Sequence, residues 1–142
     1  MILYWYHYVM KLINRDTDYA VRALVHMAKS PQQISSAKVL VDDLHMPRAF
    51  SRRLLQVLSK KGILQSAKGK GGGFSFRKSP KKIKLKDLVE VFQKDFIKTR
   101  CIFKKKICPD IGTCPLRHKI RGIEKKVIDE LAAISIADLI KD

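Results

Sequence analysis

The hydrophobic pattern between Ser35 and Arg77 changes its period once, at Gly62, and this change limits the folds open to the chain. Before Gly62, apolar residues recur at helical spacing in two short segments, which are separated by a turn of about three residues that ends at Pro47. After Gly62, the period is two on both sides of the glycine-rich segment 68–73. Two short helices followed by a β-hairpin predict a winged helix-turn-helix, in the class of mainly α folds with a small β-hairpin (α+β).

Helices are also expected on both sides of this unit. Helical spacing and the stop at Ser30 and Pro31 predict a first helix over about residues 15–29. Its candidate N-caps are Asn14, Asp16 and Thr17. A short amphipathic helix is expected over 86–93. The winged helix-turn-helix domain should therefore occupy residues 10–93.

In the last part of the chain, residues 115–142, the spacing of apolar residues predicts a long helix with one apolar stripe. A short turn should follow, and Ser135 and Asp138 are spaced to cap it. A helix of about 30 Å has no obvious partner within the chain for its whole stripe. Pairing across a two-fold axis is the economical solution, so the sequence predicts a homodimer formed through this dimerisation helix. Folding back onto its own winged helix is the alternative. The stripe consists of Leu116, Ile120, Ile123, Val127, Leu131 and Ile134.

The charge of the chain is strongly positive and unevenly distributed. Its 30 Lys and Arg residues against 13 Asp and Glu give a formal net charge of +17, which favours an anionic partner such as nucleic acid or a membrane surface. Residues 46–84 contain twelve basic residues and no acidic one. A solvated surface normally mixes both signs, so this segment predicts a contact surface for nucleic acid.

The sequence gives no sign of export or of a membrane span. No apolar run reaches the roughly 18 residues that cross a bilayer, and residues 1–9 lack the basic start of a signal peptide. We therefore expect a cytoplasmic protein without a membrane partner. Residues 1–9 are interpreted as a non-essential extension ahead of a second start at Met10, with a membrane-surface anchor as the alternative.

The recognition helix is expected to follow Pro47 and to present its first residues to base edges. The candidate base-contacting residues are Arg48, Ser51, Arg52 and Arg53. In the wing, Lys68 and Lys70 would supply charge, and Gly71 and Gly72 would let the backbone approach a phosphate or a minor groove. Without DNA, the same residues would form a solvated helix face and an ordinary hairpin tip. Their coincidence in a segment without acids favours binding to double-stranded DNA.

Three cysteines, Cys101, Cys108 and Cys114, lie in the segment 94–114, which is expected to be irregular because proline and glycine interrupt it. Thiolates are the soft ligands that iron-sulfur clusters require, and cysteines so spaced on a loop can converge on one cluster. Structural zinc sites use closer pairs. A thiol redox switch or a buried structural role would also be compatible with three cysteines. The segment is thus predicted to be a sensor loop.

The order of these parts resembles the IscR/NsrR family (Rrf-type) of bacterial transcription regulators, in its cluster-binding subset. The resemblance covers essentially everything from Met10 onward. It implies a homodimeric repressor or dual regulator of palindromic operators, in which a [2Fe-2S] or [4Fe-4S] cluster reports nitric oxide, redox state or iron-sulfur supply. The matching stretches are Thr17-Asp18-Tyr19-Ala20-Val21-Arg22-Ala23-Leu24, Gly69-x-x-Gly72-Gly73-Phe74, Cys101-x6-Cys108-x5-Cys114 and Ala137-Asp138-Leu139.

The same resemblance bears on the fourth ligand of the cluster. Asp18 matches the helix-one acid that some members use, and it would reach the cluster from the partner subunit; its alternative role is a first-turn acid favoured by the helix dipole. His118 lies one residue farther from Cys114 than the family's histidine ligand, so that role is not transferred. His45 occupies a turn where glycine is usual, and histidine tolerates a positive φ.

Other classes of function find less support in the sequence. There is no nucleophile with its base, no pair of carboxylates and no phosphate-binding loop motif, so the chain is not expected to be an enzyme or to have a small-molecule substrate. A regulator switched by thiol oxidation without a cluster remains open. So does an architectural protein that packages DNA through its basic surface alone.

Overall fold

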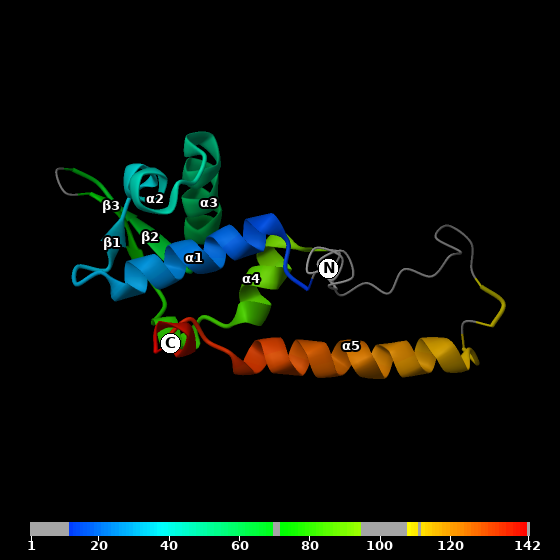
Figure 1. Cartoon of the computed structure of the whole chain (residues 1–142). Helices are drawn as coiled ribbons and strands as arrows, with labels where there is room; N and C mark the ends of the chain where they lie inside the picture. The colour runs from blue at the N-terminus through cyan, green and yellow to red at the C-terminus, as the bar shows by residue number, and fades with distance from the viewer. Residues whose placement is uncertain (1–11, 70–71, 95–107, 111, 142) are drawn as a thin grey trace, which may run out of the picture.

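The computed structural model describes residues 12–69, 72–94, 108–110 and 112–141. Its first part is a winged helix, and its last long helix runs beside that body and extends beyond it (Figure 1). The predicted extension at residues 1–9 and most of the predicted loop at 94–114 lie outside the described residues. The elements in chain order are α1 (Arg15–Lys29), β1 (Ile34–Ser35), α2 (Ala37–Leu44), α3 (Arg48–Lys60), β2 (Leu64–Ala67), β3 (Gly73–Phe76), η2 (Pro80–Lys82), α4 (Leu85–Phe92), α5 (Pro115–Ala133) and η3 (Asp138–Ile140).

The helices begin and end where local chemistry favours it. Asn14 is the N-cap of α1, and its side-chain oxygen accepts a hydrogen bond from the Thr17 amide at 2.8 Å. Ser36 caps α2 in the same manner. His45 ends α2 with φ at 53°, so this non-glycine residue does adopt the left-handed conformation in the turn of the helix-turn-helix. The mainly α class with a small sheet is confirmed.

The sheet contains one more strand than the predicted hairpin. Strands β2 and β3 pair antiparallel as expected, and the two-residue β1 adds to the other edge of β3, which gives the order β1-β3-β2. Gly73 makes this addition possible, because a Cβ atom at that position would lie 2.5 Å from the carbonyl oxygen of Ser35. The strand β1 was not predicted from the sequence.

The larger of two hydrophobic clusters among the described residues joins α1, α2, α3 and the sheet to α4 and to the residues that follow α5. Tyr19 of α1 and Phe50 of α3 pack with ring centroids 5.3 Å apart, which fixes α3 across α1. The exposed face of α3 is thereby held in a defined orientation. Fully buried side chains of this core include Leu24, Met27, Leu40, Met46, Leu54, Leu55, Leu58, Leu64, Ile83, Leu88 and Ile136.

Among the described residues, helix α5 packs against the body near its C-terminal end. There Leu131 packs against Leu85 and Val89 of α4. The backbone following α5 is tied by two hydrogen bonds, from the amide of Leu85 to the Ile134 carbonyl and from the amide of Ile136 to the Ile83 carbonyl, at 3.0 and 2.9 Å. The sequence-based alternative of folding back thus holds for this end of the helix.

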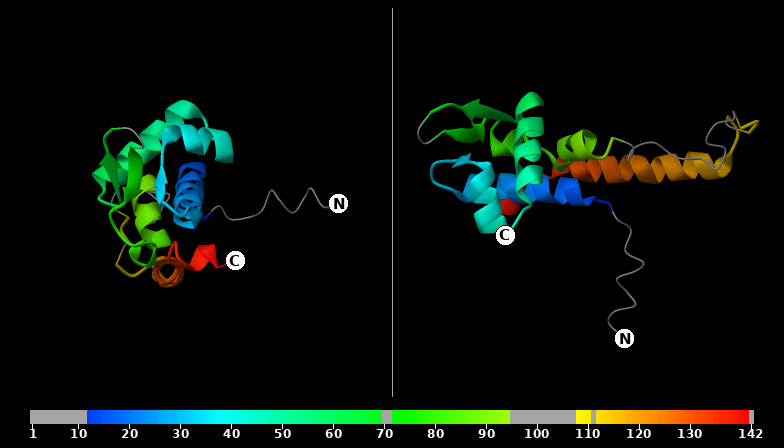
Figure 2. Two further views of the ribbon diagram at one scale, coloured as in Figure 1. Left: turned by 90° about the vertical axis from the view of Figure 1, so that its left-hand side faces the viewer. Right: turned by 90° about the horizontal axis from the view of Figure 1, so that it is seen from above.

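The N-terminal half of α5 leaves its apolar stripe open. Leu116, Ile120 and Ile123 are 69%, 37% and 55% exposed. Figure 2 shows this half of the helix projecting past the winged helix. Exposed large apolar residues in a row on one helix face favour a partner helix. The stripe is therefore available for the homodimer that the sequence predicts.

No helix among the described residues is both long and apolar enough to cross a membrane.

The turn after α5 contains the cap that the sequence predicts between Ser135 and Asp138. Asp138 accepts hydrogen bonds from the backbone amide and the hydroxyl of Ser135, at 2.8 and 2.7 Å. The hydrogen bond from the Ser135 amide, followed by that from its hydroxyl, holds the pKa of Asp138 below its usual value of 3.8. A carboxylate whose pKa is depressed by folding stabilises the native state above the unfolded pKa, and loses this effect as pH falls through the folded pKa.

We therefore expect Asp138→Asn to lower the melting temperature at neutral pH, and the difference from wild type to shrink as pH falls below the ordinary aspartate pKa of 3.8. Thermal unfolding followed by circular dichroism over this range measures it. Asp42→Asn, at an exposed position of α2, is the matched control and should leave the melting temperature unchanged. A difference that stays constant with pH would contradict the assigned charge effect.

Candidate nucleic-acid interface

The exposed face of α3 presents two arginines without ion-pair partners among the described residues. Arg48 and Arg52 lie one turn apart and are both exposed, and Gln56 continues the same row one turn farther on. The opposite face of the helix is buried in the core through Leu54, Leu55 and Leu58. A helix held rigidly by one face offers the other as a surface of defined geometry, which side-chain readout of base edges requires.

Ser51 does not belong to this exposed face, and its predicted base contact is corrected. Its side chain is fully buried, and its hydroxyl donates a hydrogen bond to the carbonyl oxygen of Pro47 at 3.0 Å. The reason is its helical position, since Ser51 precedes Leu54 and Leu55 by three and four residues and so shares their buried face. Ser51 therefore holds the start of α3 and is not presented on the exposed face of the helix.

Arg53 lies between the exposed and the packed faces of α3. Its guanidinium is 3.7 Å from the carboxylate of Asp16 in the first turn of α1, although its side chain remains 72% exposed. An exposed ion pair of this kind contributes little to stability, but it limits the directions in which the guanidinium points. Of the predicted arginines, Arg53 is thus the one that links the recognition helix to α1.

The tip of the wing is shaped by backbone conformation. Gly69 has φ at 103°, and its carbonyl oxygen accepts a hydrogen bond from the amide of Gly72 at 2.9 Å. A Cβ atom at Gly72 would lie 2.5 Å from the Ala67 carbonyl oxygen, so this glycine is needed to close the turn itself. Lys68 is exposed beside the turn. Lys70 and Gly71 lie outside the described residues.

Two of the three cysteines belong to the described part of the chain, at the start of α5. Cys108 and Cys114 are half-buried free thiols, and Cys114 is the N-cap of α5. The carbonyl oxygen of Asp110 accepts hydrogen bonds from the amides of Thr113 and Cys114, at 3.0 and 2.8 Å, so the chain between the two thiols is folded into a turn. Cys101 lies outside the described residues. Among those described, no three His, Cys, Asp or Glu side chains form a metal-binding group.

Asp18 and the two described cysteines are not brought together within one chain. The carboxylate of Asp18 accepts a hydrogen bond from Nε of Arg22 at 2.9 Å, an ion pair between successive turns of α1. Figures 1 and 2 place the beginning of α1 against the body, whereas Cys114 lies at the projecting end of α5. Within one chain, Asp18 therefore lies away from Cys114.

Comparison with known proteins decides the family. Residues 13–142 match the model of the Rrf2 family, described as iron-dependent transcriptional regulators. The chain belongs to the Rrf2 family. A helix-turn-helix transcriptional regulator of Aquifex aeolicus is 30% identical over 132 residues, which cover 91% of this chain and 92% of the relative. The regulator NsrR of Bacillus subtilis is 25% identical over 135 residues, covering 94% and 92%.

Two solved structures share the fold. IscR of T. potens has a TM-score of 0.70 at 21% identity and covers 92% of this chain and 86% of its own. The global cysteine regulator CymR of B. subtilis has a TM-score of 0.69 at 19% identity and covers 91% and 95%. The winged helix of this Rrf2 protein is thereby confirmed. Its family is one of transcriptional regulators and not of enzymes.

For this Rrf2 protein, the geometry adds one candidate that the sequence analysis missed. Gln56 extends the row of Arg48 and Arg52 and is exposed. Its amide can donate to and accept from an adenine edge, which an arginine cannot do. Its spacing of four residues from Arg52 is the signal that could have identified it from the sequence.

Proposed function

We propose that this Rrf2 regulator acts as a homodimer that binds a palindromic DNA operator through α3 and the wing, and that Cys101, Cys108 and Cys114 hold an iron-sulfur cluster that controls this binding. The single observation that carries the DNA-binding part is the exposed row of Arg48 and Arg52 on a helix whose other face is buried. Basic side chains with no acidic partner in the described chain are free to meet an anionic ligand.

The proposed interface has two kinds of residue. Some would read the base sequence, and the others would position the protein on the DNA backbone. Arg48, Arg52 and Gln56, which are exposed on one face of α3, would contact base edges in a major groove. Lys68, with Lys70 and Gly71 beside it in the sequence, would contact phosphate or enter the adjacent minor groove. Arg53 would contribute a phosphate contact, because its pairing with Asp16 holds it to the side of the row. Two copies would place their recognition helices in successive major grooves, about 34 Å apart.

The donor set suits an iron-sulfur cluster. Three thiols are available, of which Cys108 and Cys114 are half-buried, not disulfide-bonded and joined by a turn. The description of the family as iron-dependent supports iron as the metal. Asp18 of the partner subunit is the proposed fourth ligand, since within one chain it lies away from Cys114. A bound cluster would supply a centre that reacts with nitric oxide or changes with redox state or iron-sulfur supply.

The chain itself connects the cysteines to the dimer. Cys114 caps the first turn of α5, and Leu116 and Ile120 of the open stripe follow directly. A change in the turn between Cys108 and Cys114 therefore acts on the residues that would pair two subunits. The spacing of the two recognition helices would change with it, which raises or lowers operator affinity.

Footprinting tests DNA recognition. The purified protein, incubated with promoter-containing genomic fragments, should protect discrete inverted repeats. Uniform coverage without a preferred repeat would instead support an architectural role and overturn specific regulation. Measuring the affinity at several salt concentrations is part of the experiment, because phosphate contacts alone give a steep salt dependence without sequence preference.

For the cluster, we expect protein purified without oxygen to contain iron and to show visible charge-transfer absorption, and Cys114→Ser to lose both. His118→Ala is the control and should retain them, since His118 lies outside the proposed ligand set. Iron analysis and absorption spectra measure the result. A wild-type protein that stays colourless after anaerobic reconstitution would overturn the cluster. If oxidation then changed its operator affinity, a direct thiol switch would replace it.

A further inference from the structure

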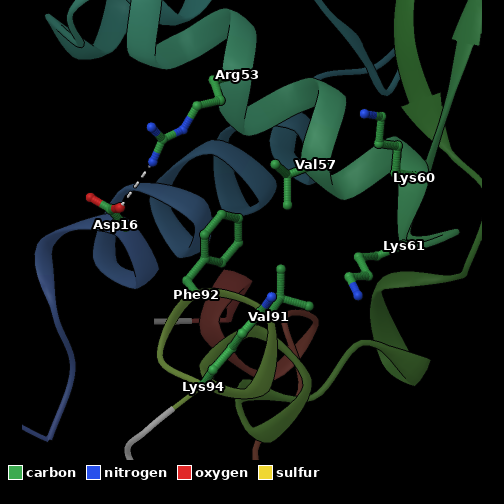
Figure 3. A pocket seen from close by; sticks show the side chains of 8 residues that line it. All are labelled: Asp16, Arg53, Val57, Lys60, Lys61, Val91, Phe92 and Lys94. Carbon is green, nitrogen blue, oxygen red and sulfur yellow. Dashed lines mark ion pairs between the residues drawn. The ribbon is translucent and has the colours of Figure 1, made fainter.

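A cavity of about 310 Å³ lies where the start of α1, the second half of α3 and the end of α4 meet. Its floor is apolar and its rim is charged (Figure 3). Val57, Val91 and Phe92 lie between the pair of Arg53 and Asp16 on one side and the two lysines at the end of α3 on the other. The lining residues are Asp16, Arg53, Val57, Lys60, Lys61, Val91, Phe92 and Lys94.

The charges of this cavity suit an anion. Four of the lining side chains are cationic and one is anionic. The three lysines have no ion-pair partner among the described residues, and all three are exposed. Several like charges around one opening repel each other until an anion neutralises them. Asp16 offsets only one of the four positive charges, that of Arg53, which it contacts.

The floor distinguishes the expected ligand from a DNA phosphate. A phosphate backbone needs cations but gains nothing from an apolar surface beneath them. Phe92 packs against the main core on one side and lines the cavity on the other, with Val57 and Val91 beside it. Small-molecule sites combine such an apolar lining with a few convergent polar groups.

We propose that this cavity binds a small organic anion with an apolar body, of the class of an aromatic or branched carboxylate or phosphate monoester. The anionic group would lie at the rim of the cavity, which carries Arg53, Lys60 and Lys94. The hydrocarbon part would lie on Val57, Val91 and Phe92. The ligand would be an effector and not a substrate, because the lining offers no hydroxyl, thiol or imidazole and its one carboxylate is paired with Arg53.

The position of the cavity couples it to the two parts of the proposed switch. An anion bound there competes with Asp16 for Arg53 on the recognition helix. It also contacts Lys94, the last described residue before the segment that carries Cys101. The end of α4 is clamped to the start of α1, because the side-chain oxygen of Gln93 accepts from the amide of Asn14 at 2.8 Å. The effect on DNA affinity rests on the proposed function, whereas binding itself does not.

The test uses phenyl phosphate as the probe and the full-length protein without DNA. Chemical shifts of Val57, Val91 and Phe92 should change with saturation in an NMR titration. Inorganic phosphate, which lacks the apolar body, and benzyl alcohol, which lacks the charge, should each bind at least ten-fold more weakly. Equal binding of the two phosphates would show a phosphate-contact surface and overturn the organic ligand. No saturable change with phenyl phosphate would overturn the cavity as a site.

A pair of double variants checks the location. Lys60→Ala with Lys94→Ala should weaken phenyl phosphate at least ten-fold. Lys81→Ala with Lys82→Ala removes the same charge from η2, outside the cavity, and should leave the affinity at the wild-type value. Equal losses in both would mean that net charge alone attracts the probe, and would overturn the proposal. These readouts contain no DNA, so a failed footprint would overturn the proposed function without altering them.

Discussion

Replacing Ile123 with aspartate is expected to convert the protein to a monomer and to lower operator affinity by at least about 100-fold. Ile123 lies in the open half of the α5 stripe and is 55% exposed in one chain, so the substitution leaves the folded monomer intact. In a dimer, the new carboxylate would be buried against the partner helix without a counter-charge, which opposes association. A monomer would occupy only one half of the operator, so the contacts of the second recognition helix with DNA would be lost. Sedimentation velocity and fluorescence anisotropy measure the two effects.

Gly122→Asp is the matched control for this variant. It adds the same charge one residue earlier, outside the apolar stripe, where a Cβ atom meets nothing within 4 Å. This control should remain dimeric and bind the operator at close to wild-type affinity. A dimeric Ile123→Asp protein would contradict pairing through the α5 stripe.

Arg52→Ala is expected to cost about 1–3 kcal/mol of operator binding, which is roughly a 5- to 150-fold loss, and to relax the preference at one base pair. Arg52 is exposed at the centre of the α3 row and has no ion-pair partner among the described residues, so its removal does not disturb the fold. Anisotropy titrations with the footprinted operator and with each of its single base-pair variants measure both the loss and the position that is relaxed.

Lys68→Ala provides the contrast for Arg52→Ala. A lysine at the wing that contacts only phosphate should weaken all sequences alike and reduce the slope of affinity against salt by about one. If Arg52→Ala left the base preference unchanged and only weakened binding uniformly, the assignment of the α3 row to base edges would be wrong.

Features determined by neighbouring residues could be predicted from the sequence. The bounds of α1 at residues 15 and 29, the hairpin after Gly62 and the cap formed by Ser135 and Asp138 follow from helical period, turn chemistry and N-cap residues within a few positions. These signals are local, so they survive folding unchanged. The apolar stripe of α5 belongs to the same group, because its spacing is visible in the sequence, whereas the packing of its C-terminal part on α4 is not.

Features that depend on distant residues could not be predicted. The strand β1 has two residues and forms only because β3 offers a free edge where Gly73 has no side chain. The pairing of Arg53 with Asp16 and the clamp of Gln93 on Asn14 join residues 37 or more positions apart. Ser51 is different, because its place on the buried face was readable from its spacing to Leu54 and Leu55.

Because α5 is attached near its C-terminal end, a small rotation at that end moves its N-terminal end by a larger distance. The hydrogen bonds between the strand-like segments around Ile83 and Ile136 form the fixed point of this rotation, and Cys114 lies at the opposite end of the helix. Over a helix of about 28 Å, a rotation of roughly 10° at the fixed point displaces the opposite end by about 5 Å. Conversely, a shift of that size near Cys114 needs only a small rotation of the winged helix. A shift of this size at the start of α5 would therefore correspond to a small reorientation of the winged helix that carries α3.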